Sequence, residues 1–462
     1  MTAVAAPGTL PKNNLPKNNL AADGSAATGA AGTRGRGYLI SRVTLPDPPG
    51  IRDVVIRDGM IESVQPSGSV RPDGLVEIDG KGLVALPALV EPHAHLDKAL
   101  TADMVPNERG DLTSAITAWV SARPTMATAD ITRRALETAY RYLAHGTTAI
   151  RTHTDTGAGI GARAVQALLS VRATLQGTVD VQVVAACSVP STGVAGADNR
   201  ATFLAALDAG ADVIGGAPWL DPEPLKALDY LLSVAAERRL PVDLHLDETL
   251  DVGTLTLVSL AERVVGGFPA AVTASHCVSL GVQPPDVQRT VAASLAAANI
   301  SVVALPQTNL YLQGRAQASS PPRGITAIAV LREAGVVVAA GGDNIQDPFN
   351  PMGRADPLET ASLLVTAGHR HPLAALEAVT GAARSVLGLA SPAVAVSQPA
   401  DLVLVPGPGP AMAMAGASPE RTVIRQGRVV ARTRVTTEFE RGRPSRQRPQ
   451  NVGTTKPEGD QP

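Results

Sequence analysis

Short apolar runs alternate with Ala- and Leu-rich stretches through the centre of this chain. The strand-like runs cover 83–93, 147–153, 179–186, 211–217, 241–247, 270–276, 300–306 and 336–343. Most are separated by stretches with the longer apolar spacing typical of helices. Eight strands alternating with helices over about 250 residues predict an α/β fold, a (β/α)8 TIM barrel. The competing architecture is an open doubly wound sheet, but no G-x-G-x-x-G motif follows the first strand.

The pattern changes on both sides of this central region. Between residues 37 and 89, and again at 400–407 and 421–435, short β-like runs are separated by Pro, Gly and Asp. We therefore expect a small β-sandwich domain formed from both chain ends, with 37–88 and 399–435 flanking a barrel at 89–398. The outer segments 1–36, which contains an LPKNN repeat, and 436–462 are polar and aperiodic, so disordered tails are expected there.

Composition and charge narrow the possible functions. The 462 residues carry a formal charge of −2, which gives no basic footprint for nucleic acid. No run of 18 apolar residues predicts a membrane span, and no secretory signal is evident, so a cytoplasmic location is expected. The two cysteines, Cys187 and Cys277, are far apart and lack C-x-x-C spacing. This argues against a disulfide framework and against a thiolate zinc site.

Histidines gather at the predicted strand ends, where barrel enzymes carry their chemistry. Five of the eight histidines in the chain lie there: His93, His95, His153, His245 and His276. A lone histidine is more often a structural residue than a ligand, but five at equivalent positions favour a functional site.

A metal site follows from the spacing of these residues. His93 and His95 are two positions apart on a strand, so their side chains share one face and can bind one ion. Together with His245 and Asp343 they offer the nitrogen and oxygen ligands that a catalytic divalent metal requires. Such an ion lowers the pKa of a bound water, which makes hydroxide available near neutral pH.

Other polar residues at the strand ends have candidate roles in catalysis. Glu248, three residues beyond a predicted ligand, could carry a proton to a leaving nitrogen. His276 could orient the hydroxide and the substrate, and Asp343 could be both ligand and proton acceptor. His153 and Asp155 could support the ligating histidines, which are usually oriented by such partners.

Several segments together resemble a known family. They are EPHAHLDK (91–98), RTHTD (151–155), HLDE (245–248), TASH (273–276), NLYLQGR (309–315), RGIT (323–326) and GDNIQDPFNPMG (342–353). In this order they resemble the amidohydrolase superfamily, and within it the cytosine deaminase branch, with similarity also to N-isopropylammelide amidohydrolases. The resemblance spans roughly residues 38–435.

The resemblance implies the same roles that the residue types suggest. Positions matching His93, His95, His245 and Asp343 hold one iron or zinc ion in that family, with cobalt or manganese as further options. The position matching Glu248 carries protons. Many relatives hold two metals bridged by a carboxylated lysine on the fourth strand, but that strand has no lysine here, so a single ion is expected.

Departures from the branch concern the substrate. Cytosine deaminases have a glutamine, which reads the pyrimidine amide, at the position of Ser188. Asn344 and Phe349 replace an aspartate and a tryptophan after the eighth strand, and the resemblance suggests that Gln313 faces the site. These four residues are our candidates for substrate binding. The loss of placed polar partners predicts a less polar substrate.

The sequence therefore predicts a hydrolase of carbon–nitrogen bonds other than peptide bonds, which deaminates a cytosine-like nitrogen heterocycle. One alternative is hydrolysis of an amide, carbamate or thiocarbamate bond in a less polar small molecule. Another is a non-enzymatic barrel protein, although such relatives usually lose their ligands. We expect a small-molecule substrate, no nucleic acid or membrane partner, and a homo-oligomer.

Overall fold

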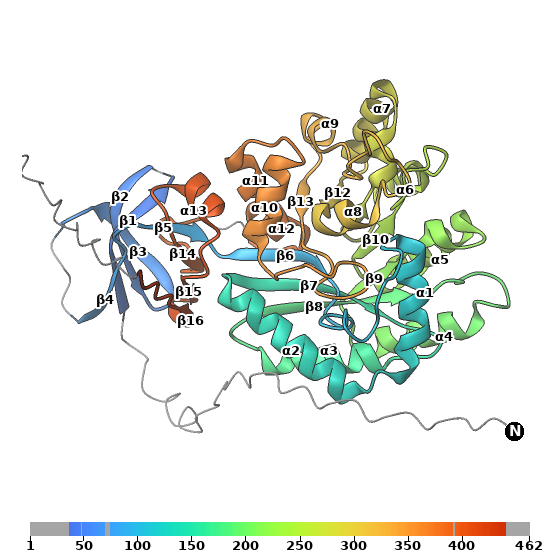
Figure 1. The fold of residues 1–462 in the computed structure, drawn as a ribbon, viewed down its shortest axis with the longest axis horizontal. Helices are drawn as coiled ribbons and strands as arrows, with labels where there is room; N and C mark the ends of the chain where they lie inside the picture. The colour runs from blue at the N-terminus through green and yellow to red at the C-terminus, as the bar shows by residue number, and fades with distance from the viewer. Residues whose placement is uncertain (1–36, 48, 70–73, 391–392, 440–462) are drawn as a thin grey trace, which may run out of the picture.

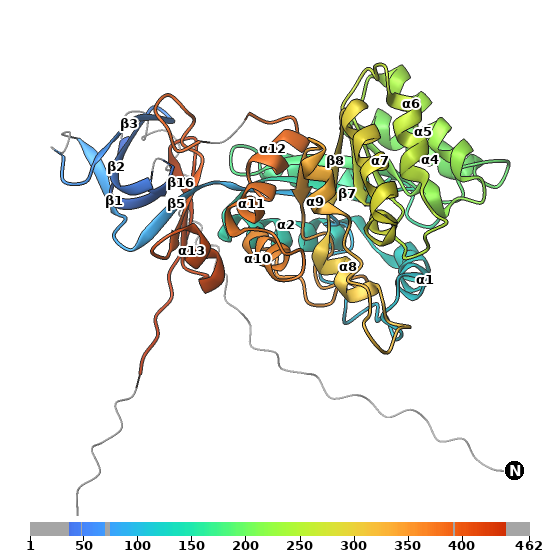
Figure 2. The ribbon, with the colours of Figure 1, turned by 90° about the horizontal axis from the view of Figure 1, so that it is seen from above.

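The structure, a computed structural model, describes residues 37–47, 49–69, 74–390 and 393–439. The predicted tail at 1–36, and the part of the other predicted tail from 440 onward, lie outside these residues. The described chain forms a barrel with a smaller β structure beside it (Figure 1). Figure 2 shows the same side-by-side arrangement from above.

Eight parallel strands build the barrel in chain order. They are β6 (Leu89–Ala94), β7 (Thr147–Asp155), β8 (Asp180–Cys187), β9 (Val213–Gly216), β10 (Val242–Leu246), β11 (Val272–His276), β12 (Ile300–Ala304) and β13 (Val338–Ala340). The ring closes after β13, where the amide of Asp343 donates to the carbonyl of His93 (3.0 Å) and the amide of His95 donates to the carbonyl of Asp343 (3.2 Å). The predicted (β/α)8 fold is confirmed.

Most of the helices cover the outside of this sheet. The longer ones are α1 (Leu112–Ala122), α2 (Thr128–Ala144), α3 (Arg163–Thr174), α4 (Ala197–Asp208), α5 (Pro224–Arg238), α6 (Thr256–Val264), α7 (Pro285–Ala297) and α10 (Pro357–Thr366). The shorter ones are α8 (Pro306–Leu312), α9 (Ile328–Glu333), α11 (Pro372–Ala378) and α12 (Gly381–Val386). In α2, Ile131, Ala135 and Ala139 recur every four residues and are all buried, as expected of a helix that packs one face on a sheet.

Two expectations from composition can be compared with the structure. No helix of the described residues is both long enough and apolar enough to cross a bilayer. Cys187 and Cys277 are both buried free thiols. Burial raises the pKa of Cys187 to about 12 and that of Cys277 well above its usual range, so both are protonated at neutral pH.

The smaller β structure unites the two ends of the described chain. Its strands are β1 (Gly37–Pro46), β2 (Pro49–Arg57), β3 (Met60–Pro66), β4 (Leu75–Asp79), β5 (Leu83–Pro87), β14 (Leu402–Pro406), β15 (Arg421–Arg425) and β16 (Arg428–Thr433), with α13 (Pro410–Gly416) after β14. Antiparallel pairing of β5 with β14 joins the early and late segments, as predicted. All eight strands belong to one hydrogen-bonded sheet rather than two, because β1 pairs with β2, β4 and β5.

The apolar run 83–93 differs from its prediction as one barrel strand. Its first half is β5 of the smaller sheet, and its second half is β6 of the barrel. The break falls at Pro87 and Ala88, where the amide of Ala88 donates to the carbonyl of Asp401 (3.0 Å). A proline cannot donate to a sheet, so it suits the point where the chain passes from one sheet to the other.

Two buried arginines of β15 attach the smaller sheet to the barrel. The guanidinium of Arg421 donates to the carbonyl of His145 (2.6 Å) and to both carboxylate oxygens of Asp356 (2.9 and 2.6 Å). Arg425 pairs with Asp180 (2.7 Å) and donates to the carbonyl of Thr148. These bonds hold the two sheets in one arrangement.

Arg421→Met should destabilise the protein by about 3–5 kcal/mol, because it leaves Asp356 and a buried carbonyl without their charged partner. Urea unfolding followed by circular dichroism measures this loss. Arg428→Met, at an exposed position on the adjacent strand, should stay within about 0.5 kcal/mol of the parent. Equal stability of the two variants would show that the Arg421 bridge does not stabilise the fold.

Candidate metal centre and active site

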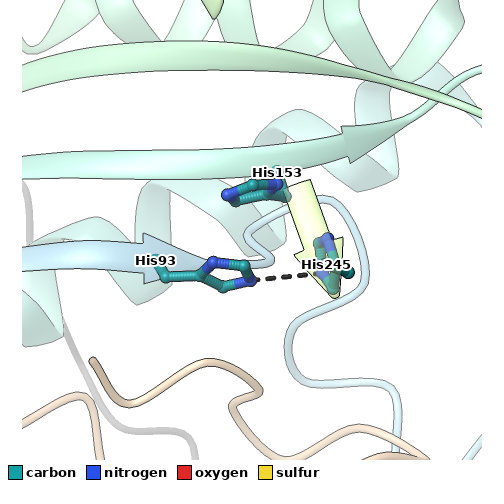
Figure 3. A group of neighbouring side chains, drawn as sticks. All are labelled: His93, His153 and His245. Carbon is teal, nitrogen blue, oxygen red and sulfur yellow. Dashed lines mark hydrogen bonds between the residues drawn. The ribbon is translucent and has the colours of Figure 1, made fainter. Parts of the chain in front are cut away.

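The four predicted metal ligands converge at the carboxyl ends of the barrel strands. His245 Nε2 lies 3.2 Å from the Nε2 atoms of both His93 and His95. Asp343 Oδ1 lies 3.2 Å from His95 Nε2 and 3.6 Å from His93 Nε2. Figure 3 shows His93 and His245 pointing toward one another, with His153 beside them. An ion about 2.1 Å from four tetrahedral ligands would separate them by about 3.4 Å, so this spacing suits a metal.

The chemistry of these side chains also fits a cation. Both carboxylate oxygens of Asp343 are buried and have no hydrogen-bond partner within the described residues. A bare buried carboxylate is costly unless a cation or donor compensates it. Burial, together with the neighbouring histidines, holds the pKa values of His93 and His245 well below the usual range. Both are therefore neutral imidazoles, the form that binds metal.

A chain of hydrogen bonds orients His93. Its Nδ1 lies 2.9 Å from Ser275 Oγ, and the Ser275 hydroxyl donates to Asp243 Oδ1 (2.7 Å). Ser275 Oγ must therefore accept a hydrogen bond from the protonated Nδ1 of His93. The lone pair of Nε2 is then free to face the cluster. Arg151 donates to the other oxygen of Asp243 (2.9 Å). Burial raises the pKa of Asp243, but His153 and Arg151 outweigh it and lower the pKa to about 2.

Ser275→Ala should weaken metal affinity by about 10- to 100-fold, because it removes the acceptor that fixes the tautomer and ring orientation of His93. Titration against a competing chelator measures the change. Ser279→Ala is a matched control, because Ser279 is also buried but its hydroxyl has no hydrogen-bond partner in the described part of the chain. A similar loss in both variants would attribute the effect to packing rather than to orientation.

His95 and Asp155 are linked through Lys98. Lys98 Nζ lies 3.2 Å from His95 Nδ1. Lys98 is buried and donates to Asp155 Oδ1 (3.2 Å), while Trp119 Nε1 donates to Asp155 Oδ2 (2.7 Å). Burial raises the pKa of Asp155, but the nearby cations, Lys98 first, lower it to about 2. Asp155 thus holds a charged lysine beside the cluster.

His153 stacks on His93, with ring centroids 3.8 Å apart (Figure 3). Its Nε2 lies 3.6 Å from Asp243 Oδ1, and neither ring nitrogen has a hydrogen-bond partner within the described residues. His153 therefore packs against the ring of His93, and it lies close to Asp243, the carboxylate that orients His93 through Ser275.

Glu248 and His276 lie on another side of the cluster and share one neighbour, Asn309. Asn309 Nδ2 donates to Glu248 Oε1 (3.1 Å) and lies 3.1 Å from His276 Nδ1. Burial, and next the charge of Asp343, raise the pKa of Glu248 well above its usual range. Burial lowers the pKa of His276 to about 4. Burial thus favours the protonated form of the Glu248 carboxyl, and His276 beside it is a neutral imidazole at neutral pH.

Two of these residues, His276 and Asp343, have a left-handed backbone conformation that directs their side chains toward the cluster. His276 has φ +68° at the end of β11, and Asp343 has φ +62° after β13. Non-glycine residues in this region cost of order 1–3 kcal/mol each, and proteins retain them where a side chain must be held in place. Here the turn ends each strand and leaves the side chain at the cluster.

A cavity of about 230 Å³ opens over the cluster. Three of the four predicted substrate residues line it, Ser188, Asn344 and Phe349. Gln313 lies outside its wall, because the amide of Gln313 donates to the backbone carbonyl of Glu248 (3.2 Å) and so supports that segment. The outer wall is apolar and consists of Leu112, Ile116, Val120, Val189 and Leu220.

Sequence reasoning missed several residues of this site. Asp243 could have been found, because it lies two positions before His245 on a strand and so shares its face. Asn309 and Arg123, which also lines the cavity, come from helical segments between strands. No strand alternation marks such positions.

A closed barrel with a histidine-rich cluster and a buried carboxyl at its strand ends is typical of a metal-dependent barrel hydrolase. Comparison with known proteins agrees, since residues 121–431 match the model of the Amidohydrolase family. The chain belongs to the amidohydrolase family, as its motifs predicted. It is an enzyme, a hydrolase acting on carbon–nitrogen bonds other than peptide bonds.

The chain is similar to three characterised proteins in sequence or in structure. The chain is 34% identical over 387 residues to a pterin deaminase of Rhizobium rhizogenes (strain K84 / ATCC BAA-868), covering 82% of this chain and 88% of the relative. It superposes on 5-methylcytosine deaminase from Klebsiella pneumoniae with a TM-score of 0.79 at 27% identity, covering 87% and 99%. It superposes on N-isopropylammelide isopropylaminohydrolase from Burkholderia multivorans ATCC 17616 with a TM-score of 0.74 at 30% identity, covering 86% and 98%.

Proposed function

We propose that this enzyme deaminates an amino-substituted nitrogen heterocycle with the help of one divalent ion, Fe²⁺ or Zn²⁺, held by His93, His95, His245 and Asp343. Co²⁺ and Mn²⁺ suit the same nitrogen and oxygen ligands. The observation that carries the proposal is the placement of the buried carboxyl of Glu248 beside this cluster at one cavity. When bound, the ion would lower the pKa of a water molecule so that it attacks carbon near neutral pH.

In this proposal Asp343 acts as the proton acceptor and Glu248 acts as the proton donor. Water adds to the ring carbon that bears the amino group, and Asp343 accepts a proton from it. Glu248 donates its proton to the departing nitrogen, so the carbon–nitrogen bond breaks and ammonia leaves. The ring keeps the water oxygen, whose remaining proton passes to the neighbouring ring nitrogen, so the product has a carbonyl beside a ring N–H. Glu248 regains the proton that Asp343 took.

Asn309 fixes the tautomer of His276 in this scheme. Because the Asn309 amide donates to Nδ1 of the neutral imidazole, the His276 proton resides on Nε2. Nε2 is buried without a hydrogen-bond partner within the described residues and lies 3.9 Å from Asp343 Oδ2. This N–H is a preplaced donor for the oxygen that develops charge on the reacting carbon.

A second candidate is hydrolysis that releases an alkylamine, or cleavage of an amide or carbamate bond, in a less polar molecule. The apolar outer wall of the cavity favours it, since Leu112, Ile116 and Val120 of α1 could cover an alkyl group. The N-isopropylammelide relative is consistent with this candidate. The leaving group distinguishes it from the deaminase.

Metal-loaded enzyme and a panel of aminopyrimidines, aminotriazines, pterins, N-alkylated azines, amides and carbamates test the proposal. We expect ammonia release from at least one aminated heterocycle with kcat/KM of about 10⁴ M⁻¹s⁻¹ or more. Release of alkylamine alone would favour the second candidate. No release from any heterocycle by enzyme with a full metal complement would refute the proposed function.

The homo-oligomer and the cytoplasmic location stay predictions from the sequence. Size-exclusion chromatography with light scattering measures the oligomeric state, and fractionation of source cells locates the protein.

A further inference from the structure

A buried guanidinium lines the cavity with few partners. Arg123 begins the short 3-10 helix η2 (Arg123–Thr125), and its side chain is only 9% exposed. Its guanidinium donates to Ser188 Oγ (3.2 Å) and lies 3.9 Å from Asp155 Oδ2. Its Nε has no hydrogen-bond partner within residues 37–47, 49–69, 74–390 and 393–439. A guanidinium carries five N–H donors, so most of its bonding capacity is unused by the described residues.

The two neighbours of Arg123 are already engaged. The hydroxyl of Ser188 donates to the carbonyl of Thr156, so it offers Arg123 only a lone pair. Asp155 is shared with Lys98 (3.2 Å) and Trp119 (2.7 Å), both closer to it than Arg123. A buried cation with incomplete bonding is costly unless a ligand completes it.

We infer that Arg123 binds the substrate through two adjacent acceptor atoms, a ring carbonyl oxygen and the ring nitrogen next to it. The inference rests on the proposed deaminase function. A guanidinium is a planar fork of donors, and arginine reads the O6 and N7 edge of guanine through the same pair of bonds. Arg123 is therefore a specificity residue for an edge that presents acceptors only.

This edge identifies a class of substrate. A fused two-ring heterocycle with a 2-amino and a 4-oxo group presents its carbonyl oxygen beside a nitrogen of the second ring, on the side away from the amino group. Cytosine has no second ring, and the ring edge away from its amino group pairs one N–H donor with one carbonyl acceptor. Arg123 would leave that N–H without an acceptor. We therefore assign the fused two-ring class to this enzyme.

Ser188 explains how the site differs from a cytosine reader. A glutamine amide at this position would offer one donor and one acceptor, which matches the cytosine edge. The serine is too short to read a ring, and it instead accepts a hydrogen bond from Arg123. In this enzyme the polar contact to the substrate comes from Arg123 in η2 rather than from the segment after β8. It offers hydrogen-bond donors only, whereas a glutamine amide would offer a donor and an acceptor.

Pterin and 5-deazapterin test the contact, because they differ only in the ring nitrogen beside the carbonyl. A good bidentate pair contributes about 1–3 kcal/mol, so wild-type kcat/KM should favour pterin by about 5- to 150-fold. Arg123→Met should lose this preference, with a ratio near one and most of the change in KM, while the metal content is retained. Arg133→Met is the matched control, since Arg133 is 64% exposed on α2, and it should keep the wild-type ratio.

Arg123→Lys serves as a second variant in case the methionine variant does not fold. It retains the charge but loses the planar fork, so it should also lose the preference for pterin. An unchanged ratio in a folded Arg123 variant would refute the contact. Wild-type turnover of cytosine as efficient as that of pterin would refute the substrate class.

A binding measurement separates this inference from the proposed function. Lumazine, the 2,4-dioxo counterpart of pterin, and 5-deazalumazine are titrated into metal-loaded enzyme and followed by fluorescence. A preference for lumazine that disappears in Arg123→Met supports the inference even if no ammonia is released, in which case only the deaminase proposal fails. Equal affinity of the wild type for both probes would overturn the inference, whatever the activity.

Discussion

Asp343→Ala should abolish turnover, with kcat reduced by about 10⁴-fold or more, because it removes both a predicted metal ligand and the proposed proton acceptor. The purified variant should also retain little metal after mild chelation. Steady-state kinetics and elemental analysis measure the two effects. Without metal, the substitution should not destabilise the fold, since neither oxygen of the buried carboxylate has a hydrogen-bond partner among the described residues.

The exposed acid Asp286 on α7 provides the control for this experiment. Asp286→Ala should keep its metal and its activity. If Asp343→Ala binds metal as tightly as the control, Asp343 is not a ligand. If it is much less stable than the control in the presence of a chelator, its role is structural instead.

Glu248→Gln should lower kcat by about 10²- to 10⁴-fold and leave KM and metal content nearly unchanged. Glutamine keeps the size of the side chain and an oxygen that can accept from Asn309, but it has no proton to give to the leaving nitrogen. Rates at saturating substrate, with metal analysis of the same preparation, measure the effect. Glu262→Gln, on the exposed face of α6, makes the same chemical change away from the cavity.

Two outcomes would contradict the role of Glu248. Near-normal kcat in Glu248→Gln would mean that another group supplies the proton. Loss of metal together with activity would mean that Glu248 supports the cluster rather than the proton transfer.

Much of the fold and part of the site followed from simple periodicities. Apolar runs of strand length predicted the barrel, because each inner strand is buried on both faces. Alternation along a strand placed His93 and His95 on one face, and their atoms do converge with those of His245 and Asp343. The same alternation also marks Asp243, whose link to His93 runs through Ser275.

The remaining features depend on how loops and helices pack, which no period encodes. Arg123 enters the cavity from η2, and Asn309 reaches Glu248 and His276 from α8. The loop with Gln313 folds so that the amide meets a backbone carbonyl instead of the cavity. The run 83–93 reads as one strand because both halves are apolar, and only tertiary pairing assigns Leu83–Pro87 to the other sheet.

The closure of the barrel between its first and last strands determines when during synthesis the metal site can form. His93 and His95 end the first barrel strand, and Asp343 follows the last, joined to them by the two backbone hydrogen bonds that close the ring. During synthesis the histidine pair leaves the ribosome long before Asp343 does, so a complete set of donors exists only once the whole ring has been made. Binding of a metal by all four ligands must then occur late. An ion held by residues of the first strand and by Asp343 after the last strand would stabilise the closed ring against opening.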